Sequence, residues 1–264
     1  MQNEILLKQL SERQLVMSKF VHEIRNPLTL VSCELQMLTS LHPEAENWRE
    51  VYNIQEQLTY IKNLISEFSD YNNAGRLVIK PADMYSFLYN AAESFRPMFE
   101  YLNIDFITEI SADLPEIPAD TLRLRQAITN LLRNAEESIS HDHGEIILQA
   151  SMIPDTPADI CTDTHTDILA DDSVISSDIQ MKQSCNSTPV PLLHISISDN
   201  GCGIEPEHLS QLGKPFVTYK ENGTGLGLTI TRQIIESHGG TIKIESLPSK
   251  GTTVHLYLPS SRMI

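Results

Sequence analysis

Apolar residues recur every three or four positions over the first third of the chain, which predicts two long amphipathic helices. The first helix, over residues 4–41, carries an apolar seam whose steps alternate between four and three, as in a coiled coil. The members of this seam are Met17, Val21, Ile24, Leu28, Val31, Leu35 and Leu38, with Leu10 and Leu7 before them. The second helix, over residues 45–71, repeats the spacing with Val51, Ile54, Leu58, Ile61, Ile65 and Phe68. Two such helices predict an antiparallel helical hairpin, and a second copy would complete a dimeric four-helix bundle.

The polar face of the first helix carries a histidine beside a carboxylate and close to a proline. With Val21 and Ile24 in the seam, His22 and Asn26 face water one helical turn apart. Pro27 removes the hydrogen bond to the carbonyl of the residue four before it, at a cost of about 3 kcal/mol, and should kink the helix. A lone surface histidine usually has no function, and a plain coiled-coil spacer would explain both helices, but a spacer does not need a proline in its middle.

From about residue 76 the pattern changes to mixed helix and strand, which predicts an α/β domain over residues 76–264 after a helical domain over residues 1–75. Helices are expected over residues 84–98, 121–140 and 228–238, with Asp120 as a cap of the second. Strands are expected over residues 104–110, 144–152, 192–198, 241–246 and 252–258, the last two as a hairpin. Residues 154–191 are rich in Asp, Ser and Thr and contain no aromatic residue, which predicts a disordered acidic loop.

Two asparagines stand on one face of the helix expected over residues 121–140. Asn130 and Asn134 lie four residues apart, beside an apolar stripe that includes Leu124, Ile128 and Leu131. Asparagine is disfavoured inside helices because its side chain competes for the backbone, so a pair on one face favours a polar ligand. An amide oxygen suits Mg²⁺ that also holds phosphates, whereas a solvated helix face is the alternative interpretation.

Two glycine-rich segments follow the predicted strand over residues 192–198. Asp199 comes at the end of that strand, before Gly201 and Gly203, so that a flat ring can approach the turn and an adenine amino group can donate to the carboxylate. The second segment has glycines at the alternate positions Gly223, Gly225 and Gly227, whose N–H groups favour phosphate at the start of a helix. These glycines also predict a mobile lid. Neither a P-loop nor a Rossmann turn has this spacing.

Composition limits the classes of partner. The chain has 264 residues and a formal net charge of −16, so general binding to nucleic acid is not expected. Its four cysteines show no C-x-x-C spacing, which indicates free thiols in a reducing cytoplasm. No apolar run approaches the roughly 18 residues of a membrane span, so no span is predicted in this chain.

The ordered motifs H-E-I-R-N-P, N-L-L-R-N-A, D-N-G-C-G-I, P-F-V-T-Y-K and G-T-G-L-G-L together resemble the transmitter core of bacterial sensor histidine kinases, closest in style to the nitrogen-regulatory and sporulation kinases. The resemblance covers nearly the whole chain except the acidic loop. It implies an α+β protein: a dimerisation and phosphoacceptor hairpin, then an α/β sandwich ATPase domain with three helices on a mixed sheet. It also implies ATP and Mg²⁺ as cofactors, a homodimer, a response regulator as partner, and a cytoplasmic location.

The resemblance also assigns roles to single residues. It makes His22 the phosphoacceptor, Glu23 its base or polariser, and Asn26 the residue that orients water for dephosphorylation of the partner. It makes Asn134 the magnesium-binding residue and Asp199 the residue that reads adenine. The other nucleotide-binding positions it implies are Asn130, Arg133, Gly201, Gly203, Thr218, Tyr219, Lys220, Gly223, Thr224, Gly225, Leu226 and Gly227.

One position departs from the family pattern. Many members carry Lys or Arg three residues after the second asparagine, where this chain has Glu137, and Lys220 is expected to supply the positive charge instead. The predicted function is ATP-dependent autophosphorylation of His22 and transfer to a regulator aspartate, with phosphatase activity as an additional hypothesis. A non-catalytic, nucleotide-sensing dimeric scaffold is the alternative. The related gyrase and chaperone ATPases rank last because they lack the H-E-x-x-N-P helix.

Overall fold

A computed structural model describes residues 2–140, 142–153, 191–220 and 223–261, without the side-chain surroundings of residues 2–16 and 18. The chain forms two compact units: Met1–Arg76 with Gly213–Gln233, and Leu77–Leu212 with Ile234–Ile264. The acidic loop predicted over residues 154–191 lies, apart from Pro191, outside the described residues, as do the side chains of Leu7 and Leu10. No helix in the described ranges combines the length and the apolar character that crossing a bilayer requires.

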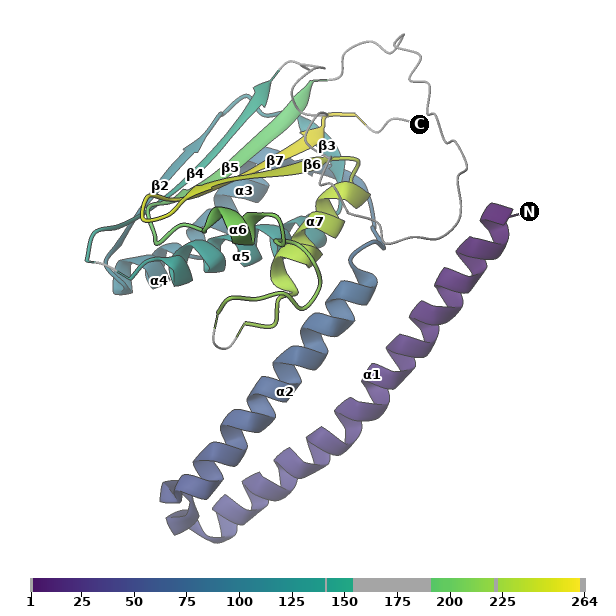
Figure 1. The fold of residues 1–264 in the computed structure, drawn as a ribbon, viewed down its shortest axis with the longest axis vertical. Helices are drawn as coiled ribbons and strands as arrows, with labels where there is room; N and C mark the ends of the chain where they lie inside the picture. The colour runs from purple at the N-terminus through teal and green to yellow at the C-terminus, as the bar shows by residue number, and fades with distance from the viewer. Residues whose placement is uncertain (1, 141, 154–190, 221–222, 262–264) are drawn as a thin grey trace. The chain divides into compact units, whose positions relative to one another are not determined.

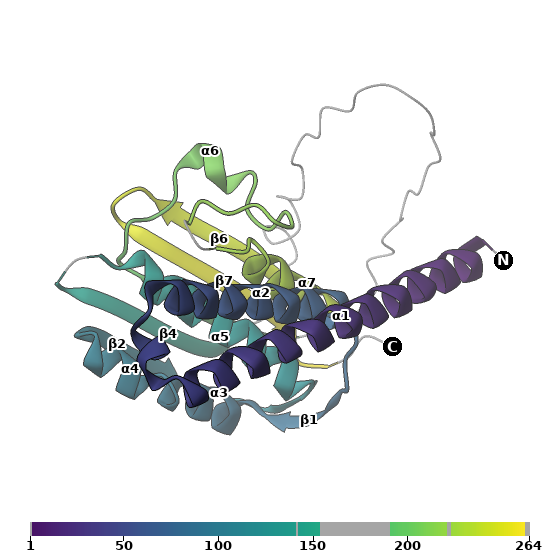
Figure 2. The same ribbon diagram turned by 90° about the horizontal axis from the view of Figure 1, so that it is seen from below.

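The first unit contains the predicted antiparallel hairpin (Figures 1 and 2). Helix α1 spans Gln2–Leu41 with Pro27 inside it, and α2 spans Arg49–Asn73. The predicted end of the first helix at residue 41 is confirmed. The second helix begins later than predicted, because the short 3-10 helix η1, Pro43–Asn47, occupies the connection and buries Ala45 completely.

A single hairpin covers only part of its apolar seam. Val21, Val51 and Leu58 are buried. Other seam members remain exposed on the single chain: Met17, Val31, Leu38, Ile54 and Ile61. The predicted seam therefore faces the second helix at some levels and solvent at others.

The second unit is built on a five-stranded mixed sheet in the order β2-β4-β5-β7-β6. Its strands are β2 Ile104–Ile110, β4 Gly144–Ile153, β5 Leu192–Asp199, β6 Thr241–Leu247 and β7 Gly251–Pro259. Only the β2–β4 pair is parallel, while β4–β5, β5–β7 and β6–β7 are antiparallel. All five predicted strands are confirmed to within one or two residues at their ends.

Helices cover one face of this sheet (Figure 1). They are α3 Met84–Glu93, α4 Arg96–Tyr101 and α5 Thr121–Ser138. The stripe predicted on α5 is buried, including Leu124, Ile128 and Leu132, and β4 and β5 bury Leu148 and Ile195. Helix α7, Gly227–Ser237, crosses the boundary between the two units. The predicted mixed sheet with helices is therefore confirmed.

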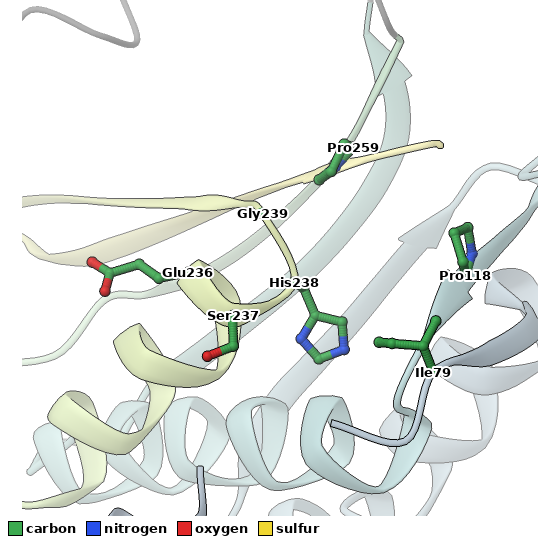
Figure 3. Close-up of a pocket in the computed structure, with 7 residues that line it drawn as sticks. All are labelled: Ile79, Pro118, Glu236, Ser237, His238, Gly239 and Pro259. Atoms are coloured by element: carbon green, nitrogen blue, oxygen red, sulfur yellow. The ribbon is translucent and has the colours of Figure 1, made fainter. Parts of the chain in front are cut away.

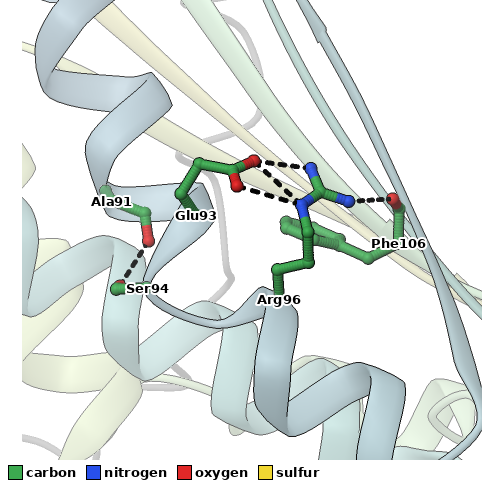
Figure 4. A network of polar contacts seen from close by, with 5 residues as sticks. All are labelled: Ala91, Glu93, Ser94, Arg96 and Phe106. Carbon is green, nitrogen blue, oxygen red and sulfur yellow. Dashed lines mark hydrogen bonds and ion pairs between the residues drawn. The ribbon is translucent and has the colours of Figure 1, made fainter.

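The single helix predicted over residues 84–98 is wrong, because the chain forms α3 and α4 there instead. Pro97 has no N–H to donate to the carbonyl of Glu93, so the helix breaks between them. The Arg96 guanidinium donates to the Glu93 carboxylate at 2.7 Å and to Phe106 O at 3.4 Å (Figure 4). Hydrogen bonding to Arg96 lowers the pKa of Glu93. The Arg96 side chain thus joins the break between α3 and α4 to strand β2.

Three further elements were not predicted. Strands β1 Lys80–Asp83 and β3 Glu116–Ala119 pair as a small antiparallel sheet, although the second lies in a proline-rich stretch that indicates a turn. Helix α6, Pro206–Leu209, has a single turn. All three elements are short, so they contain too few residues for an apolar period of two or 3.6 to be recognised in the sequence.

Candidate functional site

The polar face of α1 presents the predicted phosphoacceptor to solvent. His22, Glu23 and Asn26 are exposed. Val21, immediately before the histidine, is buried, so the orientation predicted from the seam is confirmed. Pro27 stands one residue after Asn26 within the continuous helix.

Glu23 already has a cationic neighbour on the same helix. Lys19 Nζ lies 3.8 Å from Glu23 Oε1, and both side chains are largely exposed. An exposed i,i+4 pair of this kind contributes little to stability and rearranges readily. The carboxylate is therefore accessible to a new donor, and its role as a base for His22 stays a prediction.

Helix α5 carries the two asparagines. Asp120 caps this helix as predicted, because its Oδ1 accepts from the N–H groups of Leu122 and Arg123, both at 3.1 Å. The buried stripe fixes the rotation of the helix, so that Asn130 is half-buried while Arg133 and Asn134 are exposed. Glu137, at the position where many relatives carry a cation, is also exposed.

The turn after β5 is built around the carboxylate of Asp199. Its Oδ1 accepts from Ser138 Oγ at 2.9 Å, from Gly201 N at 2.9 Å and from Thr252 N at 3.3 Å. These donors come from α5, from the turn itself and from β7. Ser138 and Thr252 were not predicted, because their contribution depends on two segments far from Asp199 in the sequence.

The two glycines of this turn are required by packing. A Cβ on Gly201 would lie 2.1 Å from Ser138 Oγ, and one on Gly203 would lie 2.0 Å from Leu247 O. Gly203 also has a φ of 67°, in the left-handed region that favours glycine. The turn predicted from these two residues is therefore tight, and it is closed against α5 and β6.

Asn200 holds the same turn to the start of β4. Its Oδ1 accepts from Glu145 N, and its Nδ2 donates to His143 O, both at 2.8 Å. The motif predicted a ligand turn without a use for this side chain. The structure shows that it joins the turn to a neighbouring strand.

The glycine-rich segment before α7 is folded back on itself within the first unit. Thr218 Oγ1 accepts from Lys220 N at 3.2 Å, and a Cβ on Gly223 would lie 2.3 Å from that hydroxyl oxygen. Gly225 has a φ of 71° and passes against the backbone of Phe216. Glu221 and Asn222 lie outside the described residues.

Several predicted nucleotide contacts in this segment have other surroundings in the structure. The Leu226 side chain is fully buried, which leaves only its backbone to meet a ligand. Thr224 Oγ1 donates to the Glu67 carboxylate on α2, while the Tyr219 side chain is half-exposed. The Phe216 ring stacks on Phe68 with their centroids 6.5 Å apart. The nucleotide roles of Thr218, Tyr219, Lys220 and Thr224 stay predictions.

The predicted residues thus gather in two places. Asp199, Gly201 and Gly203 meet the end of α5 in the second unit. The residues of the glycine-rich segment up to Gly227, where α7 begins, belong to the first unit together with α1 and its histidine.

The amide oxygen of Asn134 suits a Mg²⁺ ion that is also held by the phosphates of a nucleotide. No cluster of three or more His, Cys, Asp or Glu residues able to hold a metal exists in the described part of the chain. Mg²⁺ usually keeps several waters and takes one or two protein oxygens plus substrate phosphates. The exposed amide of Asn134 fits that role.

The second unit also contains a cavity that is lined by other residues, among them His238. Its volume is about 210 Å³, and it is lined by Ile79, Pro118, Glu236, Ser237, His238, Gly239 and Pro259 (Figure 3). His238 Nε2 accepts from Asp120 N at 3.0 Å, and Nδ1 donates to Ile234 O at 2.8 Å. Burial lowers the pKa of His238, which favours this neutral tautomer. None of the predicted site residues lines this cavity.

In comparisons with known proteins, two family models match this chain, one in its N-terminal part and one in its C-terminal part. Residues 119–262 match the family described as histidine kinase-, DNA gyrase B- and HSP90-like ATPase, and residues 12–76 match the His Kinase A (phospho-acceptor) domain. Sporulation kinase B of Bacillus subtilis is 28% identical over 260 residues, covering 95% of this chain and 51% of that protein. The histidine kinase/phosphatase NtrB of Vibrio alginolyticus is 29% identical over 253 residues, covering 94% of this chain and 63% of that protein.

Solved structures show the same fold. Full-length ShkA in complex with AMPPNP has a TM-score of 0.68 at 23% identity, covering 92% of this chain and 45% of that chain. The histidine kinase ThkA in complex with the response regulator TrrA has a TM-score of 0.55 at 21% identity, covering 92% of this chain and 60% of that chain. The present chain spans about half the length of sporulation kinase B.

Proposed function

Because the chain belongs to the family of histidine kinase-, DNA gyrase B- and HSP90-like ATPases and joins that domain to a His Kinase A domain, we propose that it is an ATP-dependent protein-histidine kinase. The two domains in this order form the transmitter core of a two-component sensor histidine kinase. The observation that carries the proposal is the exposed His22 on α1 in a chain that also holds an Asp199 turn of nucleotide-binding type.

The proposed reaction transfers one phosphoryl group to the imidazole. Glu23 accepts a hydrogen bond from one ring nitrogen of His22, which leaves the lone pair of the other nitrogen to attack the γ-phosphorus. A P–N bond forms, the bond from the γ-phosphorus to the bridging oxygen breaks, and ADP leaves with that electron pair. When bound, Mg²⁺ offsets charge on the phosphates, and the oxygen of Asn134 would hold it.

The nucleotide is bound by residues of two kinds. The Asp199 carboxylate accepts from the adenine amino group, and Gly201 and Gly203 form the tight turn that carries this carboxylate. Backbone N–H groups of the segment from Gly223 to Gly227, at the start of α7, and the ammonium of Lys220 meet the phosphates. Lys220 then supplies the charge that Glu137 cannot.

The proposal extends to assembly and to the partner. The exposed apolar positions of the hairpin, among them Val31 and Leu38, would be covered in a homodimer. The phosphoryl group then passes to an aspartate of a response regulator docked on the bundle, as ThkA is complexed with the regulator TrrA. A cytoplasmic location, where ATP is available, completes the proposal.

Radiolabelled ATP tests the proposed acceptor. Incubation of the full chain with γ-labelled ATP and Mg²⁺ should give an acid-labile, alkali-stable label on the wild-type protein. His22→Gln should abolish the label while nucleotide binding persists, because glutamine keeps a polar side chain but offers no imidazole nitrogen. His42→Gln, at an exposed histidine near the end of the same hairpin, is the matched control and should label normally. Label retained on His22→Gln would refute the site.

A second activity, dephosphorylation of the regulator, is favoured by one residue and one relative. Asn26 is exposed one turn from His22, where its amide can orient a water molecule, and the related NtrB proteins are named kinase/phosphatase. Asn26→Ala should slow loss of phosphate from the regulator about 100-fold, the lower end of the range for a positioned catalytic side chain. Autophosphorylation should continue. Equal dephosphorylation rates in variant and wild type would refute the proposed role of Asn26 in this activity.

A further inference from the structure

The end of helix α5 contributes a side chain to the nucleotide turn that the motifs do not contain. Ser138 is the last residue of α5, and its Oγ lies 2.9 Å from Asp199 Oδ1 and 2.7 Å from Ala135 O. A hydroxyl has one proton, and a charged carboxylate attracts it more strongly than a neutral carbonyl does. Ser138 therefore donates to Asp199.

This hydroxyl is one of three donors to a single carboxylate oxygen. The N–H groups of Gly201 and Thr252 approach the same Oδ1 of Asp199, at 2.9 and 3.3 Å. The two backbone donors belong to the turn and to β7, which are already fixed by the sheet. The Ser138 donor belongs to a side chain, so mutation can remove it without changing the backbone.

The backbone of Ser138 also fixes the turn. Its carbonyl accepts from Cys202 N at 3.0 Å. A Cβ on Gly201 would lie 2.1 Å from Ser138 Oγ and 2.6 Å from Ser138 O, so the turn lies directly on this residue. The helix end and the turn consequently hold the carboxylate from two sides.

We propose that Ser138 is a positioning residue for base recognition: its hydroxyl orients the Asp199 carboxylate toward the amino group of adenine. The inference rests on the proposed nucleotide-binding role of Asp199. A donor that is already in place removes part of the cost of ordering the carboxylate when the base arrives. Loss of the hydroxyl should weaken the contact with the amino group and leave the phosphate contacts unchanged.

The test compares two nucleotides that differ only in the amino group. ATP and purine riboside triphosphate, which has hydrogen in place of the amino group, are titrated into the full chain with Mg²⁺. Wild type should prefer ATP. Ser138→Ala should raise the Kd of ATP about tenfold, equivalent to one hydrogen bond to a charged group, and leave the Kd of the analogue within about twofold.

Ser140→Ala is the matched control. It removes the hydroxyl of an exposed serine two residues further along and should bind both nucleotides as wild type does. If Ser138→Ala weakens both nucleotides equally, its role is structural and the proposal is overturned, as it is if ATP binding is unchanged.

Failure of the wider proposal would look different. A wild-type chain that binds both nucleotides equally would show that Asp199 does not read the amino group, and would overturn the role of Ser138 with it. A chain that discriminates between the two nucleotides as expected, but forms no phosphohistidine, would support the positioning role of Ser138 and would overturn the proposed kinase activity.

Discussion

At the scale of single residues, one carboxylate joins three segments of the second unit. Asp120 is buried and accepts from Val78 N at 2.7 Å as well as from the first turn of α5, while its own N–H donates to His238. Burial alone would raise the pKa of Asp120, but the backbone donors, Val78 first among them, lower it overall. Asp120 is therefore a cap and also an anchor for the chain that follows α2.

Removal of this carboxylate should destabilise the second unit. Asp120→Ala should lower the free energy of unfolding by about 2 kcal/mol, because it removes the helix cap and leaves a partly buried N–H without its acceptor. Asp120→Asn is the matched control, since its amide oxygen still caps the helix, and it should lose less than half as much. Urea unfolding at pH 7 measures both. Equal losses would show that charge, and not the acceptor geometry, is responsible.

At the scale of elements, a pair of histidines lies across strands β5 and β7. His194 Nε2 and His255 Nδ1 are 3.0 Å apart, and the His194 ring stacks on Tyr257 at 4.8 Å. Burial lowers the pKa of His194 and His255; proximity to His255 lowers that of His194 further, whereas nearby Glu245 opposes the shift at His255. The pair is therefore most stable uncharged.

The pair predicts loss of stability in mild acid. Because the folded pKa values lie below the ordinary value of 6.5, the unfolded chain takes up protons first as the pH falls. Stability is thus fully present above about pH 6.5 and declines as the pH falls from there toward the folded pKa values. His255→Gln should reduce the drop in Tm between pH 7.5 and 5.5, whereas His143→Gln, at an exposed position, should leave it as in wild type. Calorimetry that found the same pH dependence in His255→Gln would contradict this assignment.

At the scale of the whole molecule, the seam of the hairpin is only partly covered by one chain. Val21, Val51 and Leu58 are buried, but Val31 and Leu38 are exposed at positions that the heptad pattern assigns to the same face. A second copy is the natural cover, because an isologous pairing places the same apolar positions against each other.

A charge in this face should separate the copies. Leu38→Glu should weaken dimerisation at least about 100-fold, since an unpaired carboxylate would be desolvated in an apolar interface. Gln36→Glu adds the same charge at an exposed polar position of the same helix and should remain dimeric. Light scattering during size-exclusion chromatography measures the mass of each. A wild type that is monomeric at micromolar concentration would contradict the homodimer.

Periodic signals in the sequence determined most of the fold. The end of α1 at Leu41, the cap at Asp120 and the bounds of the five main strands follow from local chemistry: a proline that cannot continue a helix, a carboxylate that accepts backbone N–H groups, and alternation along strands. The break at Pro97 was missed because the apolar stripe continues past it, and β1 and β3 because they are too short for a period.

The sequence by itself also determined that His22 and Asn26 face solvent on α1, and which motifs accompany one another. Only the tertiary structure decided that Ser138 and the backbone of Thr252 meet on the Asp199 carboxylate, and that Asn200 ties the turn to β4. The physical reason is that a motif records the local conformation of its own residues. The donors that orient a carboxylate come instead from elements brought together by packing, here 61 and 53 residues away along the chain.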